Sequence, residues 1–229
     1  MKHSGKAAKA GRNILILSFL AALVLGGIGV LVARSLDIND GAALVPVGFL
    51  WIVFAIFTLN FFRDPDAKVP TTPNVVLSPA HGKVDVIGTT VEPLFMGGEC
   101  QRISIFLSVI DVHVQNSPVT GKIAYYKYST GQFLSALKAE SAIHNENLLL
   151  GFNASDPPGK KIAVRILAGV LARRIVPWAT QGDEVPRGER ISLVQFGSRA
   201  DVYLPADAKI KVNPGDHVTG GETVLAVFE

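Results

Sequence analysis

Two long apolar runs near the N-terminus restrict most strongly what this chain can fold into. Residues 14–33 and 42–62 contain no charged side chain. A helix of about 20 residues, rising 1.5 Å per residue, matches the roughly 30 Å hydrocarbon core of a bilayer. The connection at 34–41 is polar and too short to fold alone. The two runs therefore predict a helical hairpin that spans a membrane.

Charges around the first run predict its orientation. Four cations lie within residues 1–12, whereas the connection holds one arginine and two aspartates. Cytoplasmic flanks are enriched in lysine and arginine, so both ends of the hairpin are expected in the cytoplasm. A cleaved signal peptide is the alternative for the first run, although it lacks a clear small-x-small cleavage site. We expect a basic N-terminus (1–12), a transmembrane hairpin (13–62) and a domain at 63–229 on the cytoplasmic side of the inner membrane.

Charge and cysteine content narrow the classes of partner. The chain has 229 residues, a formal net charge of +3 and a single cysteine, Cys100. One cysteine excludes an internal disulfide and a cysteine-rich metal site. Lysine and arginine are scattered without a nucleic-acid-binding motif, so no nucleic acid partner is expected. For a tethered domain, a modest positive charge favours the anionic cytoplasmic leaflet.

From Asn74 onward, short β-branched runs alternate with glycine and proline. Residues 84–87, 102–107 and 209–212 are examples. Short runs of this kind, with a turn every ten or so residues, predict a β-rich domain.

Two internal repeats indicate how that domain is built. Residues 78–84 and 117–123 share a Ser-Pro-x-x-Gly-Lys pattern, and residues 182–189 and 215–222 share Gly-Asp-x-Val-x-x-Gly-Glu. The second pattern is typical of tight hairpin turns. The repeats predict two β-halves like the flattened barrels of lipoyl and biotinyl carriers. A carrier needs an acceptor lysine between its halves, and none stands there, but a lipoyl-like interaction module stays open as an alternative.

The segment that most strongly indicates a reactive site is residues 196–205, which read Phe-Gly-Ser-Arg-Ala-Asp-Val-Tyr-Leu-Pro. Gly197 has no Cβ, so the Ser198 hydroxyl has room to approach the Gly197 carbonyl. A Gly-Ser pair alone is common in turns. Three further motifs accompany it: Phe-Phe-Arg-Asp-Pro at 61–65, Ser-Pro-Ala-His-Gly-Lys at 78–83 and Gly-Glu-Arg at 188–190. With them, the chain from about Phe61 to its end resembles the short, membrane-associated form of phosphatidylserine decarboxylase.

The resemblance implies a self-cleaving, pyruvoyl-dependent enzyme. Ser198 Oγ would attack the Gly197 carbonyl, and elimination would split the chain between 197 and 198, leaving a covalent pyruvoyl cofactor at residue 198. The fragments 1–197 and 198–229 are expected to remain together as a heterodimer. The pyruvoyl group would form a Schiff base with phosphatidylserine and withdraw electrons as carbon dioxide leaves, giving phosphatidylethanolamine.

Two histidines are the candidate acid and base. The resemblance assigns His113 the protonation of the product, although a plain strand histidine is the simpler interpretation of that residue alone. Longer relatives carry a second histidine where this chain has Asn116. The family's usual Ser-Pro-Ala-Asp-Gly motif has His81 in place of its aspartate. Either His81 is itself the base, or Asp85 or Asp111 supplies the carboxylate, or processing is slow or absent. The alternative to an enzyme is an unprocessed, non-catalytic membrane-anchored relative that binds lipid or serves in interactions.

Two further expectations concern ligands. A phospholipid headgroup needs cations for its phosphate, and Arg199 and Arg63 are the candidates. A zinc site at His81 and His113 lacks the third protein ligand that a catalytic zinc requires, so no metal is expected.

Overall fold

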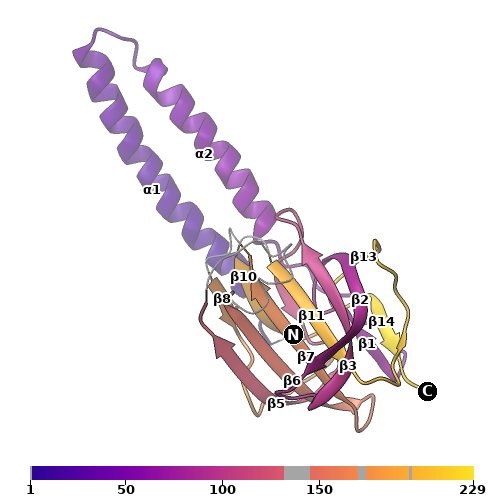
Figure 1. The fold of residues 1–229 in the computed structure, drawn as a ribbon. Helices are drawn as coiled ribbons and strands as arrows, with labels where there is room; N and C mark the ends of the chain where they lie inside the picture. The colour runs from indigo at the N-terminus through magenta and orange to yellow at the C-terminus, as the bar shows by residue number, and fades with distance from the viewer. Residues whose placement is uncertain (1, 132–144, 170–173, 196–197) are drawn as a thin grey trace. The chain divides into compact units, whose positions relative to one another are not determined.

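The computed structural model describes residues 2–131, 145–169, 174–195 and 198–229. The chain forms two compact units: Gly5–Asp64 is helical, and residues 1–4 with Pro65–Glu229 form a β-rich unit (Figure 1). Gly197, the predicted cleavage residue on the N-terminal side, lies outside the described residues.

The helical unit is the predicted hairpin, with α1 at Lys6–Ser35 and α2 at Gly41–Phe61 (Figure 1). Both helices are long and apolar enough to cross a membrane. The prediction of two apolar helices is thereby confirmed. α1 begins at Lys6, well before its apolar run. Hydropathy predicts only the part of a helix that is suited to lipid, so it did not predict this start. The Lys- and Ala-rich residues ahead of that run favour a helix as well.

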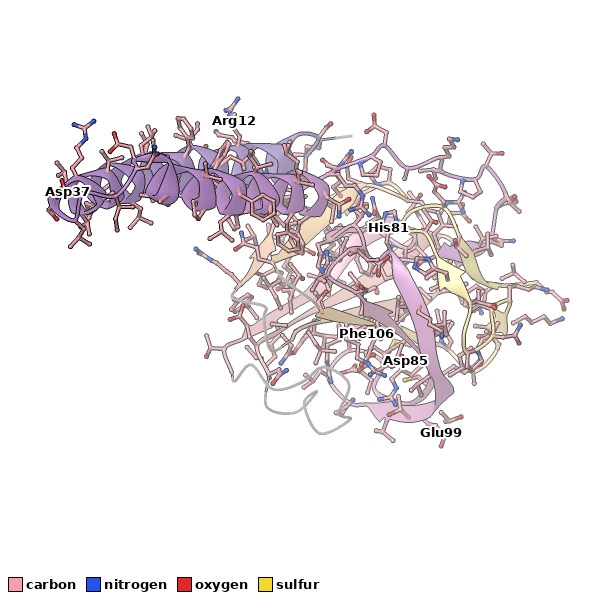
Figure 2. All side chains as sticks on the ribbon, turned by 90° about the horizontal axis from the view of Figure 1, so that it is seen from above. Arg12, Asp37, His81, Asp85, Glu99 and Phe106 are labelled. Carbon is pink, nitrogen blue, oxygen red and sulfur yellow. The ribbon has the colours of Figure 1, made fainter. Side chains whose placement is uncertain are left out.

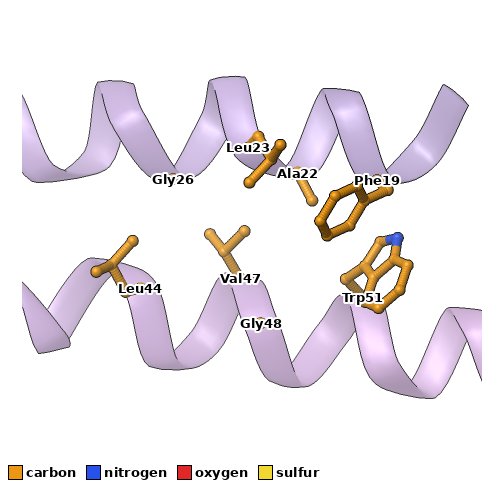
Figure 3. Close-up of a pocket in the computed structure, with 8 residues that line it drawn as sticks. All are labelled: Phe19, Ala22, Leu23, Gly26, Leu44, Val47, Gly48 and Trp51. Carbon is orange, nitrogen blue, oxygen red and sulfur yellow. The ribbon is translucent and has the colours of Figure 1, made fainter. Parts of the chain in front are cut away.

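The two helices approach each other closely at small residues and enclose a cavity elsewhere along the hairpin. A Cβ placed on Gly29 would lie 2.9 Å from the Ala43 Cβ, so the backbones approach closely there. Further along the hairpin, a cavity of about 170 Å³ opens between the helices, lined by Phe19, Gly26 and Trp51 among others (Figure 3). The aromatic rings of Phe19 and Trp51 lie 5.0 Å apart at one end of the cavity. At the other end, a Cβ placed on Gly26 would lie 3.3 Å from Leu44 Cδ2, so the helices are close there.

The β-rich unit contains one large sheet and two small ones. The 8-stranded sheet has the order β13-β2-β3-β11-β7-β6-β5-β9, and the 3-stranded sheets have the orders β1-β14-β12 and β4-β10-β8. Its strands are β1 (Val75–Leu77), β2 (Gly82–Glu92), β3 (Gly98–Leu107), β4 (Val114–Asn116), β5 (Thr120–Ser129), β6 (Asn147–Asp156), β7 (Lys161–Ala168), β8 (Arg174–Pro177), β9 (Glu184–Val185), β10 (Arg190–Gln195), β11 (Ser198–Leu204), β12 (Lys209–Ile210), β13 (His217–Val218) and β14 (Val224–Val227).

The β-rich prediction is confirmed, but the likeness to flattened barrels does not extend to closure. Within the described residues the sheets are open, and the large sheet ends on β13 and β9, each only two residues long. Such short edges expose few unpaired backbone groups, so the sheet needs no closure to protect them.

The internal repeats have matching structures. Ser78 Oγ donates to the Ala80 carbonyl at 2.6 Å, and Ser117 Oγ donates to the Val119 carbonyl at 2.8 Å. A serine side chain thus closes the same turn before β2 and before β5.

The glycine turns of the second repeat also match. Gly182 and Gly215 have φ of 94° and 102°, a region that favours glycine. Gly182 N–H donates to the Ile123 carbonyl at 2.8 Å, and Gly215 N–H donates to the Val84 carbonyl at 2.7 Å. Each turn therefore fastens an edge strand, β9 onto β5 and β13 onto β2, at equivalent places in the large sheet.

Alternation along β11 gives the centre of the large sheet two different faces. Ala200, Val202 and Leu204 join the main apolar core, whereas Tyr203 joins a smaller cluster on the opposite face. Phe95, from the turn between β2 and β3, packs against this smaller cluster. By the same alternation, Ser198 lies on the core face and Arg199 on the other.

Candidate active site

Ser198 is the first residue of β11 and is held by strands on both sides. Its cross-strand partners are Leu107 at the end of β3 and Ala168 at the end of β7. The residue is 1% exposed. Its Oγ is buried and, within the part of the chain that the structure describes, has no hydrogen-bond partner. A buried hydroxyl in that state is not committed to a structural bond, which suits a nucleophile.

His113 lies just before β4 and is fully buried. Its Nδ1 is 2.9 Å from the Asp111 carbonyl oxygen. A carbonyl only accepts hydrogen bonds, so Nδ1 carries the proton and Nε2 carries the lone pair in the neutral ring. The His113 carbonyl in turn accepts the Val194 N–H at 3.1 Å. Val194 belongs to β10, the strand that leads into the predicted cleavage site, so His113 is fixed to that strand.

Sequence reasoning missed how Asp111 holds this region together. Its main-chain oxygen orients His113, while its carboxylate accepts the Ser108 N–H at 2.8 Å and lies 3.2 Å from His217 Nε2. Asp111 was one of two open candidates for a carboxylate beside the histidine base. The contact to His113 comes from the Asp111 main-chain oxygen, and a role of the Asp111 carboxylate in self-cleavage stays a prediction. The Ser-x-x-Asp spacing at 108–111, typical of side-chain-capped turns, was the available signal.

His81 lies directly before β2 and is half-buried. A Cβ placed on Gly220 would lie 3.0 Å from His81 Cδ2 and 3.0 Å from Asn116 Oδ1. His81 and Asn116 therefore flank the same glycine. Both positions are ones at which the resemblance implies a departure from the family's motifs.

The sheet register places His81 and Ser198 at the same end of the large sheet. Phe106 of β3 pairs with Lys83 of β2 on one side and with Arg199 of β11 on the other. Figure 2 labels Phe106 and also His81, which directly precedes β2. The starts of β2 and β11 are thus two strand spacings apart, about 10 Å. One end of the sheet brings together Ser198, His81 and the chain leading to His113.

Arg199 is buried and held by two carboxylates. Its Nη1 is 2.9 Å from Asp85 Oδ2, and its Nε is 3.1 Å from Asp201 Oδ1. Asp201 is 1% exposed, whereas the Asp85 side chain is 30% exposed. Burial is the main cause that raises the pKa of Asp85, and the nearby Arg199 charge offsets part of that rise. The charge of Arg199 is therefore balanced inside the domain.

Comparison with known proteins identifies the family. The family model described as phosphatidylserine decarboxylase matches residues 54–226. The chain belongs to the phosphatidylserine decarboxylase family. The family predicted from the sequence is thereby confirmed, and with it the assignment of the chain as an enzyme.

Individual relatives agree with the family match. A phosphatidylserine decarboxylase proenzyme of Desulfotalea psychrophila is 44% identical over 77% of this chain and 82% of its own length. One of Symbiobacterium thermophilum is 44% identical over 75% of this chain and 79% of its own length. One of Cupriavidus metallidurans is 40% identical over 77% of this chain and 80% of its own length.

Arg63, the second predicted phosphate ligand of this decarboxylase, belongs to the helical unit. Its Nη1 donates to the Asn60 carbonyl at 2.6 Å and to Asn60 Oδ1 at 3.0 Å, at the C-terminal end of α2. A cation at this end of a helix also interacts favourably with the helix dipole. Its contact with a lipid headgroup stays a prediction.

Proposed function

We propose that this chain decarboxylates phosphatidylserine to phosphatidylethanolamine through a pyruvoyl group that it makes from Ser198. The relatives are named proenzymes, which implies processing. The observation that carries the proposal is the Ser198 hydroxyl, which is buried at the start of β11 with no hydrogen-bond partner among the described residues. The Ser198 hydroxyl is thus suited to act as the nucleophile of the cleavage.

The cleavage balances without any added oxidant or reductant. Ser198 Oγ attacks the Gly197 carbonyl and loses its proton, and the Gly197–Ser198 peptide bond breaks to leave an ester. Loss of the Ser198 α-proton breaks the Cβ–Oγ bond, which frees a Gly197 carboxylate and leaves a dehydroalanine. Water then hydrolyses this residue to a ketone with release of ammonia. The ketone supplies the electron-withdrawing carbonyl that decarboxylation of an amino acid headgroup requires.

The two fragments are expected to stay associated after cleavage. Fragment 198–229 supplies β11 to β14, and β11 lies between β3 and β7 at the centre of the large sheet. Separating it would expose a strand with apolar residues such as Val202 and Leu204, both fully buried. The product would therefore be a heterodimer of 1–197 and 198–229.

We assign His113 the proton transfer during decarboxylation. Its Nδ1 is engaged by Asp111, so Nε2 is the nitrogen that exchanges a proton with the reacting group. We assign His81 the base of self-cleavage, since it lies at the Ser198 end of the sheet and stands in the position of the family's aspartate. A neutral imidazole brings no fixed negative charge, so it would act as the base itself rather than orient another one.

Phosphate recognition is proposed for Arg63 and Arg199. Because Asp85 and Asp201 already balance the charge of Arg199, Arg63 is the stronger candidate. The two apolar helices would keep the catalytic domain beside its lipid substrate, on the cytoplasmic side of the membrane.

Mass spectrometry of the purified full-length chain tests the proposal. We expect two fragments, 1–197 and 198–229, the second beginning with a pyruvoyl group. Ser198→Ala should give a single intact chain. Ser104→Ala is the matched control, because Ser104 is also fully buried with an Oγ that has no partner among the described residues, and it should be cleaved normally. An intact wild-type chain would contradict the proposal and favour the non-catalytic relative.

Release of carbon dioxide from labelled phosphatidylserine separates the two histidines. His113→Ala should lower decarboxylation by about 10²–10⁴-fold even in the fraction that is cleaved. His81→Ala should slow cleavage itself. Unchanged turnover in His113→Ala would remove this residue from the mechanism.

A further inference from the structure

An exposed apolar residue lies on the loop that connects the two halves of the site. Residues 108–112 join Leu107, the cross-strand partner of Ser198, to His113. Ile110, within this loop, is 66% exposed. Single exposed apolar residues are common on protein surfaces. The position of Ile110 beside the reacting residues sets it apart from a scattered one.

The loop holds Ile110 outward in a fixed turn. Ser108 N–H donates to Asp111 Oδ2 at 2.8 Å, and Asp111 N–H donates to the Ser108 carbonyl at 2.9 Å. Hydrogen bonds at both ends of the turn limit how far Ile110 can fold back toward the core. Transfer of such an exposed apolar side chain from water into another apolar phase is favourable.

A histidine and a lysine lie next to the same turn. His217 Nε2 is 3.2 Å from Asp111 Oδ1, and the His217 side chain is 65% exposed. His217 pairs in register with Lys83, which is also exposed. An apolar tip near an exposed lysine suits the interface of a bilayer with anionic headgroups.

We infer, on the basis of the proposed function, that Ile110 enters the interfacial region of the bilayer while the exposed Lys83 meets anionic headgroups beside it. A lipid surface is favoured over a protein partner because two apolar helices already suit this chain to a bilayer. The loop would bring the surface of the bilayer to the residues that act on a lipid headgroup.

Depth-dependent fluorescence quenching tests the inference on the full-length chain in lipid nanodiscs. Ile110→Cys, in a Cys100→Ala background, carries an environment-sensitive fluorophore, and the nanodiscs contain phosphatidylcholine, phosphatidylglycerol and a spin-labelled lipid. Val91→Cys is the matched control, because Val91 is 65% exposed and pairs with Glu99 at the other end of β3. The two ends of that strand are about 30 Å apart.

We expect quenching of the label at residue 110 and little at residue 91. Equal quenching at both positions, or none at residue 110, would overturn the inference. The measurement does not depend on cleavage and is repeated in Ser198→Ala, so its failure is distinguishable from failure of the proposed function.

A kinetic measurement gives a second readout. Ile110→Asp should raise the apparent KM for phosphatidylserine by about tenfold, with the processed fraction unchanged. The phosphatidylserine is presented in vesicles of phosphatidylcholine and phosphatidylglycerol. Val91→Asp should leave both quantities at their wild-type values. An unchanged KM in Ile110→Asp would contradict a membrane contact at this loop.

Discussion

Replacing Arg199 with methionine should destabilise the β-rich unit strongly. Methionine retains much of the apolar stem but removes the charge that Asp85 and Asp201 share. Asp201 is 1% exposed, so water cannot solvate its carboxylate once the guanidinium is gone. Asp85 is 30% exposed and is partly solvated in either case. The cost therefore falls mainly on Asp201.

The expected loss follows from that burial. Removing one partner of a buried ion pair costs about 3–5 kcal/mol, because the remaining charge is left buried without compensation. For a domain of roughly 150–250 residues, 1 kcal/mol corresponds to about 2–4 °C in Tm. The predicted decrease for Arg199→Met is therefore about 6–20 °C.

Thermal unfolding in a Ser198→Ala background measures this decrease on a single intact chain. Adding Asp201→Asn to Arg199→Met removes the uncompensated charge and should recover most of the lost Tm. A decrease of less than about 2 °C in Arg199→Met would refute the assignment of a buried charge pair at this site. So would a double variant that is no more stable than Arg199→Met.

Two further predictions use the same thermal assay. Gly188→Ala should lower the Tm more than Gly182→Ala. Both glycines have positive φ, but only at Gly188 would the new Cβ meet another side chain, Val69 Cγ2 at 2.3 Å. Equal decreases in Tm would contradict a steric contribution at Gly188. The Tm of Asp85→Asn should rise relative to that of the wild type as the pH increases from 4 to 7. Burial raises the pKa of Asp85 in the folded protein, so the protonated carboxyl stabilises the wild type and this stability is lost as the pH rises through the folded pKa. Asparagine does not ionise and so does not lose it. A difference in Tm that stays constant over this pH range would show that burial of Asp85 carries no such cost.

Patterns that depend on nearby residues were predictable from the sequence. Each apolar run specifies a membrane-length helix by itself, since the requirement is only length and hydropathy. The repeated Ser-Pro motifs form the same local hydrogen bond in both copies, because each serine bonds to the carbonyl of a residue close by in the sequence. Ser198 was identified in the same way, from its immediate neighbours and the family resemblance.

Contacts that depend on the sheet register were not predictable. Asp85 lies 114 residues before Arg199, and only the pairing of β2, β3 and β11 brings them together. The sequence shows the charge of Arg199 but not the carboxylates beside it, and contact of Arg199 with the substrate stays a prediction.

The sequence by itself determined the two apolar helices, the β-rich class, the family and the serine at the predicted cleavage site. Only the tertiary structure decided that the Asp111 carbonyl fixes the His113 tautomer, that His81 and Asn116 flank Gly220, and that Ser198 lies between β3 and β7. The physical reason is the distance along the chain over which each kind of interaction acts. Propensity and hydropathy act over a few neighbouring residues, whereas these contacts follow from strand pairings between distant segments, which the whole core stabilises together.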